Sequence, residues 1–331
     1  MTDTSVIDND HTVPTTDTTH VGIAIGPVTI TVAEVSHGPH GPLLTRFGAA
    51  PTPVGAFSGG HPADADMLGR GIAAAMMFTN PTPGSTVHVA VSGPAVSRTV
   101  KPEPTGNPTR DDRATKAAHY GLNERQIAAY DTKLQPGKGM TIGPKPVIGM
   151  IREVLASGNI PTTAIIPAGI AAAAGLPPTP GTCGLLVVEG DSVTGTILAD
   201  NDPLIVRTID GLGRADAVRT WLRDGRIDTS AASSMAKASE DLARRIIGIS
   251  PVPGQRIYVA GDAATYPGVI DGLNAAMPDN VSIQLVEGVA DHIAGPVALT
   301  DDERATVGPR LLTALGAARL GASGNNATLR G

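Results

Sequence analysis

Residues 20–35 read HVGIAIGPVTITVAEV, and residues 184–198 read GLLVVEGDSVTGTIL. Each stretch consists of an apolar run of β-forming residues, a glycine and a second β-forming run, which is the pattern of a β-hairpin. The two turn glycines, Gly26 and Gly190, are 164 residues apart, about half of the chain. A hairpin that recurs at this interval predicts two halves of similar construction.

A third glycine turn follows in the second half, where residues 256–268 read RIYVAGDAATYPG. The run before Gly261 predicts a buried strand that leads into a helix. Because strands come first in each half and helices after them, the predicted class is α/β. Helical periodicity is expected over residues 64–78, 145–157, 164–176, 214–223, 232–247, 269–276 and 300–320.

Length and composition allow two domains and exclude several classes of function. The chain has 331 residues, of which 41% are hydrophobic but only 2% aromatic, so its cores must consist of Ala, Val, Ile and Leu. A net charge of −6 without a Lys/Arg-rich run argues against nucleic acid or anionic lipid as a direct partner. Cys183 is the single cysteine, which excludes a disulfide framework and a cysteine metal site. With neither an 18-residue apolar stretch nor a signal-peptide pattern, the expected location is the cytoplasm.

Several short segments resemble, in order, proteins of the PilM and FtsA branch of the actin-like ATPase superfamily. This resemblance covers roughly residues 21–320 and implies an actin-like fold, which is a duplicated ribonuclease H-like fold of two domains around a nucleotide cleft. Besides the hairpins and the third turn, it rests on VHVAVSGPAVSR at 87–98, ASGNIP at 156–161, AGIAAAAG at 168–175, IVRTI at 205–209 and LTALGAAR at 312–319.

The resemblance also sets the expected domain boundaries. A proline-rich linker, PPTPG at 177–181, separates the two halves, and the segment corresponding to the family's inserted subdomain 1C is short. We expect a tail over 1–19, a first domain over 20–177 with a reduced insertion at about 94–160, a second domain over 181–320 and a tail over 321–331.

The chain departs from the family where a nucleotide would bind. The family's first hairpin carries an Asp two residues before the turn glycine, and Ala24 stands there, while Val188 occupies the matching position of the second hairpin. Glu189 and Asp191 flank Gly190, but neighbouring side chains of a strand point to opposite faces, so these two residues are not expected to substitute simply for the missing Asp. Asp262 replaces a glycine of the adenosine turn and adds negative charge near an anionic ligand. The predicted remnants of the cleft are Gly22, Ala24, Gly26, Val188, Gly190, Asp191, Gly261 and Asp262.

These losses predict a pseudo-ATPase, because hydrolysis needs a Mg²⁺ ion on oxygen ligands and a positioned water. ATP and Mg²⁺ are therefore disfavoured as cofactors, and no metal site is expected. What remains for function is the surface of the fold. The resemblance implies a cytoplasmic adaptor that takes up a short peptide of a membrane-anchored partner in a groove of the first domain, around Val96, Arg98, Val100, Val147 and Ile151.

Two alternatives stay open. An FtsA-like or actin-like protein would bind nucleotide and polymerise, and a sugar or acetate kinase of the same superfold would need a carboxylate base that the sequence does not position. Residues 321–331 lack the faces of an amphipathic anchor, so direct membrane insertion is not expected. Homo-oligomerisation is left open.

Overall fold

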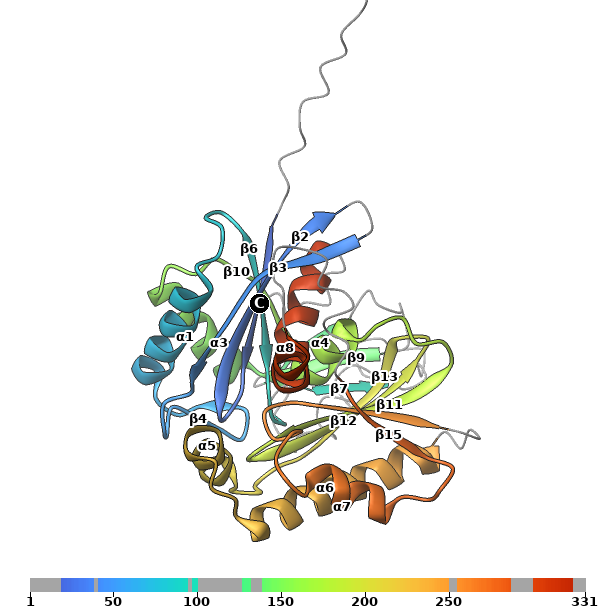
Figure 1. The fold of residues 1–331 in the computed structure, drawn as a ribbon. Helices are drawn as coiled ribbons and strands as arrows, with labels where there is room; N and C mark the ends of the chain where they lie inside the picture. The colour runs from blue at the N-terminus through green and yellow to red at the C-terminus, as the bar shows by residue number, and fades with distance from the viewer. Residues whose placement is uncertain are drawn as a thin grey trace, which may run out of the picture.

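The computed structural model describes residues 19–38, 41–94, 97–100, 127–131, 139–249, 255–286 and 300–323. It contains two five-stranded sheets, one in each half of the chain, and Figure 1 shows them on either side of a central pair of helices. The first sheet has the order β10-β6-β1-β2-β3 and the second the order β13-β12-β11-β14-β15. In each sheet a hairpin pairs antiparallel, as the repeat predicts, and the first strand of the hairpin also pairs parallel with a later strand.

The first half supplies strands β1 (His20–Ile25), β2 (Thr29–Gly38), β3 (Gly41–Pro51), β6 (Thr86–Val91) and β10 (Thr162–Pro167), with a small β4 (Phe57–Ser58) and β5 (His61–Pro62) hairpin and helices α1 (Ala65–Thr79), α3 (Lys145–Ser157) and α4 (Ala168–Gly175). The second half supplies β11 (Thr182–Glu189), β12 (Ser192–Ala199), β13 (Asp202–Ile209), β14 (Arg256–Ala260) and β15 (Ser282–Leu285), with α5 (Ala215–Asp224), α6 (Thr229–Ile249), α7 (Val269–Ala276) and α8 (Asp301–Ala322).

Five layers result from the way the faces of these elements are buried. Helices α1 and α3 cover the outer face of the first sheet, and α5, α6 and α7 pack into the hydrophobic core on the outer face of the second. Helices α4 and α8 lie between the sheets (Figure 1). Helix α8 follows the second sheet in sequence but packs against β1, β2, β6 and α4 of the first half. The end of the chain therefore ties the two halves together.

The central layer is thin because its contacts are made by small residues. A Cβ added to Gly22 of β1 would lie 1.9 Å from the carbonyl oxygen of Ala314 in α8. One added to Gly316 of α8 would lie 1.7 Å from the carbonyl oxygen of Ala171 in α4. Backbone thus packs directly on backbone, which explains a core rich in Ala and Gly and poor in aromatic residues.

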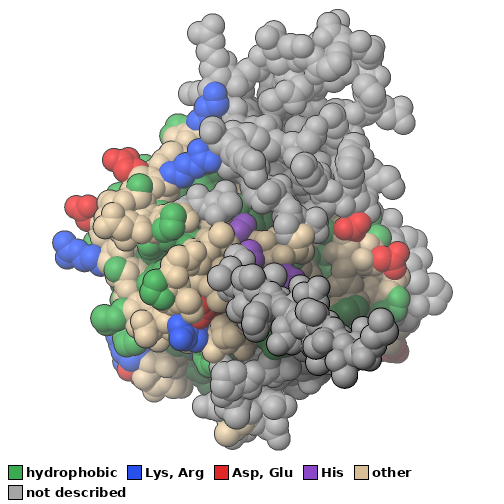
Figure 2. Space-filling view, turned by 90° about the horizontal axis from the view of Figure 1, so that it is seen from above, with side chains coloured by type: hydrophobic (Ala, Val, Ile, Leu, Met, Phe, Trp, Pro, Cys, Tyr) green, Lys and Arg blue, Asp and Glu red, His purple; other side chains and the backbone are tan. Residues whose placement is uncertain are grey.

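A buried histidine marks the end of α8. His88 of β6 is 2% exposed, and a Cβ on Gly321 of α8 would lie 2.5 Å from its ring. Burial, with a smaller effect of the neighbouring His20, lowers the pKa of His88 to about 4, so the ring is neutral at physiological pH. Figure 2 looks down on this end of the molecule and shows histidine side chains near one another there.

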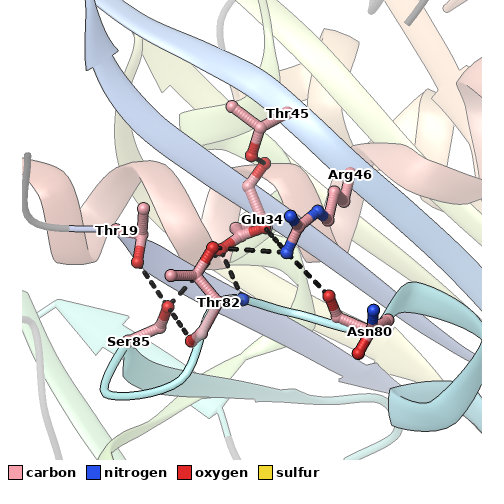
Figure 3. A network of polar contacts seen from close by, with 7 residues as sticks. All are labelled: Thr19, Glu34, Thr45, Arg46, Asn80, Thr82 and Ser85. Atoms are coloured by element: carbon pink, nitrogen blue, oxygen red, sulfur yellow. Dashed lines mark hydrogen bonds and ion pairs between the residues drawn. The ribbon is translucent and has the colours of Figure 1, made fainter.

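A buried carboxyl group, that of Glu34, holds the C-terminal end of α1 against the first sheet (Figure 3). Glu34 of β2 is 1% exposed, and its Oε1 accepts a hydrogen bond of 2.9 Å from the backbone N–H of Thr82. Arg46 of β3 lies 3.5 Å from the other carboxylate oxygen and donates a 2.7 Å hydrogen bond to the carbonyl oxygen of Asn80. Asn80 ends α1 in the left-handed conformation, with φ of 45°. The network holds the α1–β6 connection against β2 and β3.

The inserted segment is only partly described. Its described residues form a three-stranded antiparallel sheet of order β7-β9-β8, with β7 (Ser97–Val100), β8 (Ile127–Asp131) and β9 (Gly139–Pro144). Strand β7 lies against β13 of the second half. Helix α3, which the expected insertion included, packs instead on the first sheet beside α1. Over the residues that the structure describes, none of the helices combines the length and apolarity needed to cross a membrane.

Candidate functional site

The two halves meet at a narrow cleft beside the turns of both hairpins. Its free volume is about 10 Å³, no more than one water molecule needs. Four of the predicted remnants line it, namely Ala24, Gly26, Gly261 and Asp262. The other lining residues are Thr29, Thr31, Glu189, Arg310 and Thr313. The cleft is therefore filled by the protein's own side chains.

Asp262 contacts the first half across this cleft. Its carboxylate accepts a 3.0 Å hydrogen bond from the backbone N–H of Thr29 and lies 2.7 Å and 2.8 Å from the Thr29 hydroxyl. Burial raises the pKa of Asp262, and the bonds from Thr29 and the charge of Arg310 act in the opposite direction. The N–H that follows the first turn and faces the cleft is thus already bonded to a carboxylate.

Glu189 corrects one expectation from the sequence. The sequence predicts that Val188 faces the cleft in place of the family's second acidic residue. In the structure the side chain of Val188 points into the core beneath α5, α6 and α7. Because side chains alternate along β11, the next residue, Glu189, faces the cleft instead. A carboxyl group is therefore present, 7% exposed and 2.7 Å from the Ser92 hydroxyl of the first half.

The protonation state of Glu189 sets what it can do. Burial raises its pKa to about 8, opposed by the Ser92 bond and reinforced by the charges of Asp262 and Asp191. At neutral pH the group is therefore mainly protonated, which makes it a poor ligand for a cation. No group of three or more His, Cys, Asp or Glu side chains that could hold a metal ion exists within the described part of the chain.

Two arginines complete the contacts around the cleft. Arg219 of α5 donates a hydrogen bond to the carbonyl oxygen of Pro27, the residue that follows the first turn glycine. Arg310 of α8 stacks over the ring of Trp221, with its guanidinium carbon 5.7 Å from the ring centroid. Both guanidinium charges act on Asp262 and favour its ionised form.

Four predicted remnants have structural roles outside the cleft lining. Gly22 lies beneath α8 and Val188 in the outer core, as described above. A Cβ on Gly190 would lie 2.5 Å from the Cα of Ala215, so this glycine lets α5 begin against the turn. Asp191 accepts a 3.3 Å hydrogen bond from the N–H of Ala215 and thereby holds the start of α5. Gly261, which lines the cleft, has φ of 103°. A Cβ added to it would lie 2.4 Å from the carbonyl oxygen of Val188 in β11, so a larger residue would collide with this strand.

The residues expected to bind a partner fall into two groups. Val147 and Ile151 of α3 are 6% and 0% exposed and belong to the core between α3 and the first sheet, so they do not form a surface. Arg98 and Val100 lie in β7. Val96 lies outside the described residues.

The exposed end of α3 borders a hollow that the sequence did not predict. It has a volume of about 510 Å³ and is lined by Arg152, Ala156, Asn159, Ile160 and Pro161. The hollow lies where α3 turns into β10, and Asn159 takes the left-handed conformation, with φ of 54°, at that turn. The hydrophobic periodicity of α3 indicates which face of the helix is buried. It could have shown that only the opposite face can border a hollow.

Comparisons with known proteins agree with this architecture. No family model and no curated protein sequence matches the chain. A structure of the PilM–PilN type IV pilus biogenesis complex matches with 19% identity and a TM-score of 0.69, covering 90% of this chain and 97% of the other. The ethanolamine utilization protein EutJ from Carboxydothermus hydrogenoformans matches with 11% identity and a TM-score of 0.49, covering 91% and 89%. The cytoplasmic domain of EpsL, an inner membrane component of the type II secretion system of Vibrio cholerae, matches with 9% identity and a TM-score of 0.44, covering 88% and 96%. The chain has the actin-like α/β fold, and the resemblance to PilM is confirmed at the level of the fold.

Proposed function

We propose that this protein is a non-catalytic cytoplasmic scaffold, a pseudo-ATPase that binds a peptide of a membrane-anchored partner through its first domain. The observation that carries the proposal is the occupied cleft. The pocket beside the two turns, at about 10 Å³, leaves no room for a phosphate group in this arrangement, and the N–H of Thr29 is bonded to Asp262 rather than free for a phosphate. A protein of this fold that does no chemistry acts through its surfaces.

Two further points support binding to a protein partner. The structural neighbour with the highest similarity reported above is part of a complex of PilM with PilN. The hollow at the end of α3 combines apolar side chains, Ile160 and Pro161, with the amide of Asn159. An apolar hollow with a few polar groups suits a short peptide segment, in which one or two side chains are buried and the backbone is held by hydrogen bonds.

The partner experiment uses a defined probe. A synthetic peptide that spans the cytoplasmic segment of a single-pass membrane protein encoded beside this chain is titrated into the full-length protein. We expect Ala156→Trp, which fills the hollow, to weaken binding at least tenfold. Ala73→Trp, at an exposed position of α1 outside the hollow lining, is the matched control and should bind as wild type does. Equal binding by both variants would remove the hollow from the proposal, and no binding by the wild type would contradict this class of partner.

A further inference from the structure

The cleft has the parts of an anion site, and they come from both halves of the chain. Thr29 contributes a backbone N–H and a hydroxyl at the start of β2. Arg310 lines the cleft and contributes a guanidinium group, and the charges of Arg310 and Arg219 both act on Asp262. Backbone N–H groups, hydroxyls and guanidinium groups converging from different elements are typical of sites that bind phosphate or carboxylate groups.

A side chain of the protein already occupies this site. Asp262 follows Gly261, and the tight passage of Gly261 along β11 directs the next residue into the cleft. Its carboxylate takes both hydrogen bonds that Thr29 offers. Since Asp262 belongs to the second half and Thr29 to the first, this occupancy also joins the two domains.

We infer that Asp262 is an internal ligand, whose carboxylate takes the place of a bound phosphate-type anion and holds the two domains closed without any added molecule. An external ligand that bridges two domains stabilises the closed arrangement only while it is bound, whereas an internal one is present at a constant local concentration. Removing the carboxylate should loosen the cleft side of the contact between the domains and leave the Thr29 donors and Arg310 for an anion from solution.

This inference rests on the proposed function only in its premise that the cleft does no chemistry. It does not involve the hollow at the end of α3. A failed peptide titration would therefore contradict the scaffold proposal but not the inference about Asp262. An unchanged distance distribution in Asp262→Gly would contradict the inference about Asp262 but not the binding of a peptide in the hollow.

The test combines a distance measurement with an anion titration. Spin labels at Ala73→Cys in α1 and Ser233→Cys in α6, both exposed positions, report the separation of the domains by pulsed electron resonance, and the native Cys183 is buried. Asp262→Gly removes the carboxylate, and Asp279→Gly, at an exposed position, is the matched control. The probe anion is pyrophosphate.

We expect one narrow distance distribution in the wild-type background and in Asp279→Gly, with no binding of pyrophosphate at millimolar concentration. Asp262→Gly should give a broader distance distribution with a longer mean, which narrows again with pyrophosphate, and it should bind pyrophosphate at least tenfold below the highest concentration at which the wild type shows no binding. If Asp262→Gly does not fold, Thr29→Ala, which removes one donor and keeps the carboxylate, should broaden the distribution in the same direction. The inference would be overturned if neither variant changed the distance distribution. It would also be overturned if the distribution broadened but the variant did not bind pyrophosphate and pyrophosphate did not narrow the distribution.

Discussion

The carboxyl group of Glu189 at the end of β11 lies 2.7 Å from the hydroxyl of Ser92 at the end of β6, across the boundary between the two halves of the molecule. Burial holds the pKa of Glu189 at about 8 in the folded protein, against an ordinary value of 4.5. A protonated carboxyl group can accept the Ser92 hydrogen bond without placing a charge in the closed cleft. Ionisation would place that charge beside Asp262 and Asp191.

The first prediction is a loss of stability with rising pH. An acid whose pKa is raised on folding binds more protons in the folded than in the unfolded state between the two pKa values. Its contribution is fully present below about pH 4.5 and is lost as pH rises through about 8. The raised pKa of Asp262 acts in the same direction. Urea unfolding of the wild type should give a lower free energy of unfolding at pH 8.5 than at pH 6.

Glu189→Gln removes the titrating group and keeps its shape, so it should flatten this pH dependence. Glu153→Gln, the same change at an exposed position of α3, should leave the dependence as in the wild type. A wild-type stability that rises from pH 6 to pH 8.5, or an equal slope in Glu189→Gln, would show that Glu189 is not buried in its protonated form.

The second prediction concerns the thin central layer. Gly316→Ala places a Cβ where the carbonyl oxygen of Ala171 lies, so α4 and α8 must move apart. We expect a loss of about 3 kcal/mol or more in the free energy of unfolding, at or above the upper end of typical overpacking costs. Gly149→Ala is the matched control, because it changes a helical glycine of α3 at which an added Cβ would have no atom within 4 Å. Relief of the backbone entropy of glycine should make that variant more stable by about 0.5–1 kcal/mol.

The third prediction separates core from surface on α3. Ile151 is fully buried, and Ile151→Ala should cost about 2–5 kcal/mol of unfolding free energy, as truncations of buried aliphatic side chains do. Met150, its neighbour in sequence, is 36% exposed, and Met150→Ala should cost well under that. Chemical denaturation of both variants decides the matter. A loss of peptide binding in Ile151→Ala without a loss of stability would return this residue to the binding surface.

Much of the fold could be predicted from the sequence because its signals are local. The hairpins around Gly26 and Gly190 and the strand before Gly261 all form as their β-forming runs and glycines indicate. The helix expected over residues 64–78 also forms, as α1, and Asp64 caps it by accepting a 2.9 Å hydrogen bond from the N–H of Met67. These features depend on residues a few positions apart.

The cleft depends on contacts that the sequence does not report. Both faces of β11 are buried, so alternation along the strand does not say whether Val188 or Glu189 faces the other half. The expectation that Val147 and Ile151 form a binding surface is wrong for another reason, because it follows the resemblance to a family rather than the apolar spacing of these residues, which indicates the buried face of α3. The sequence predicts that Asp262 repels an anionic ligand, whereas in the structure its carboxylate is bonded to Thr29, 233 positions earlier in the chain.

The most direct test of the scaffold account is Mg²⁺-dependent ATP hydrolysis by the purified full-length protein, measured as phosphate release over hours. An occupied cleft and a protonated Glu189 predict that the rate equals that of buffer and that Glu189→Ala changes nothing. Turnover above background that disappears in Glu189→Ala would show that the cleft opens, binds the nucleotide and uses this carboxylate, and it would contradict the account.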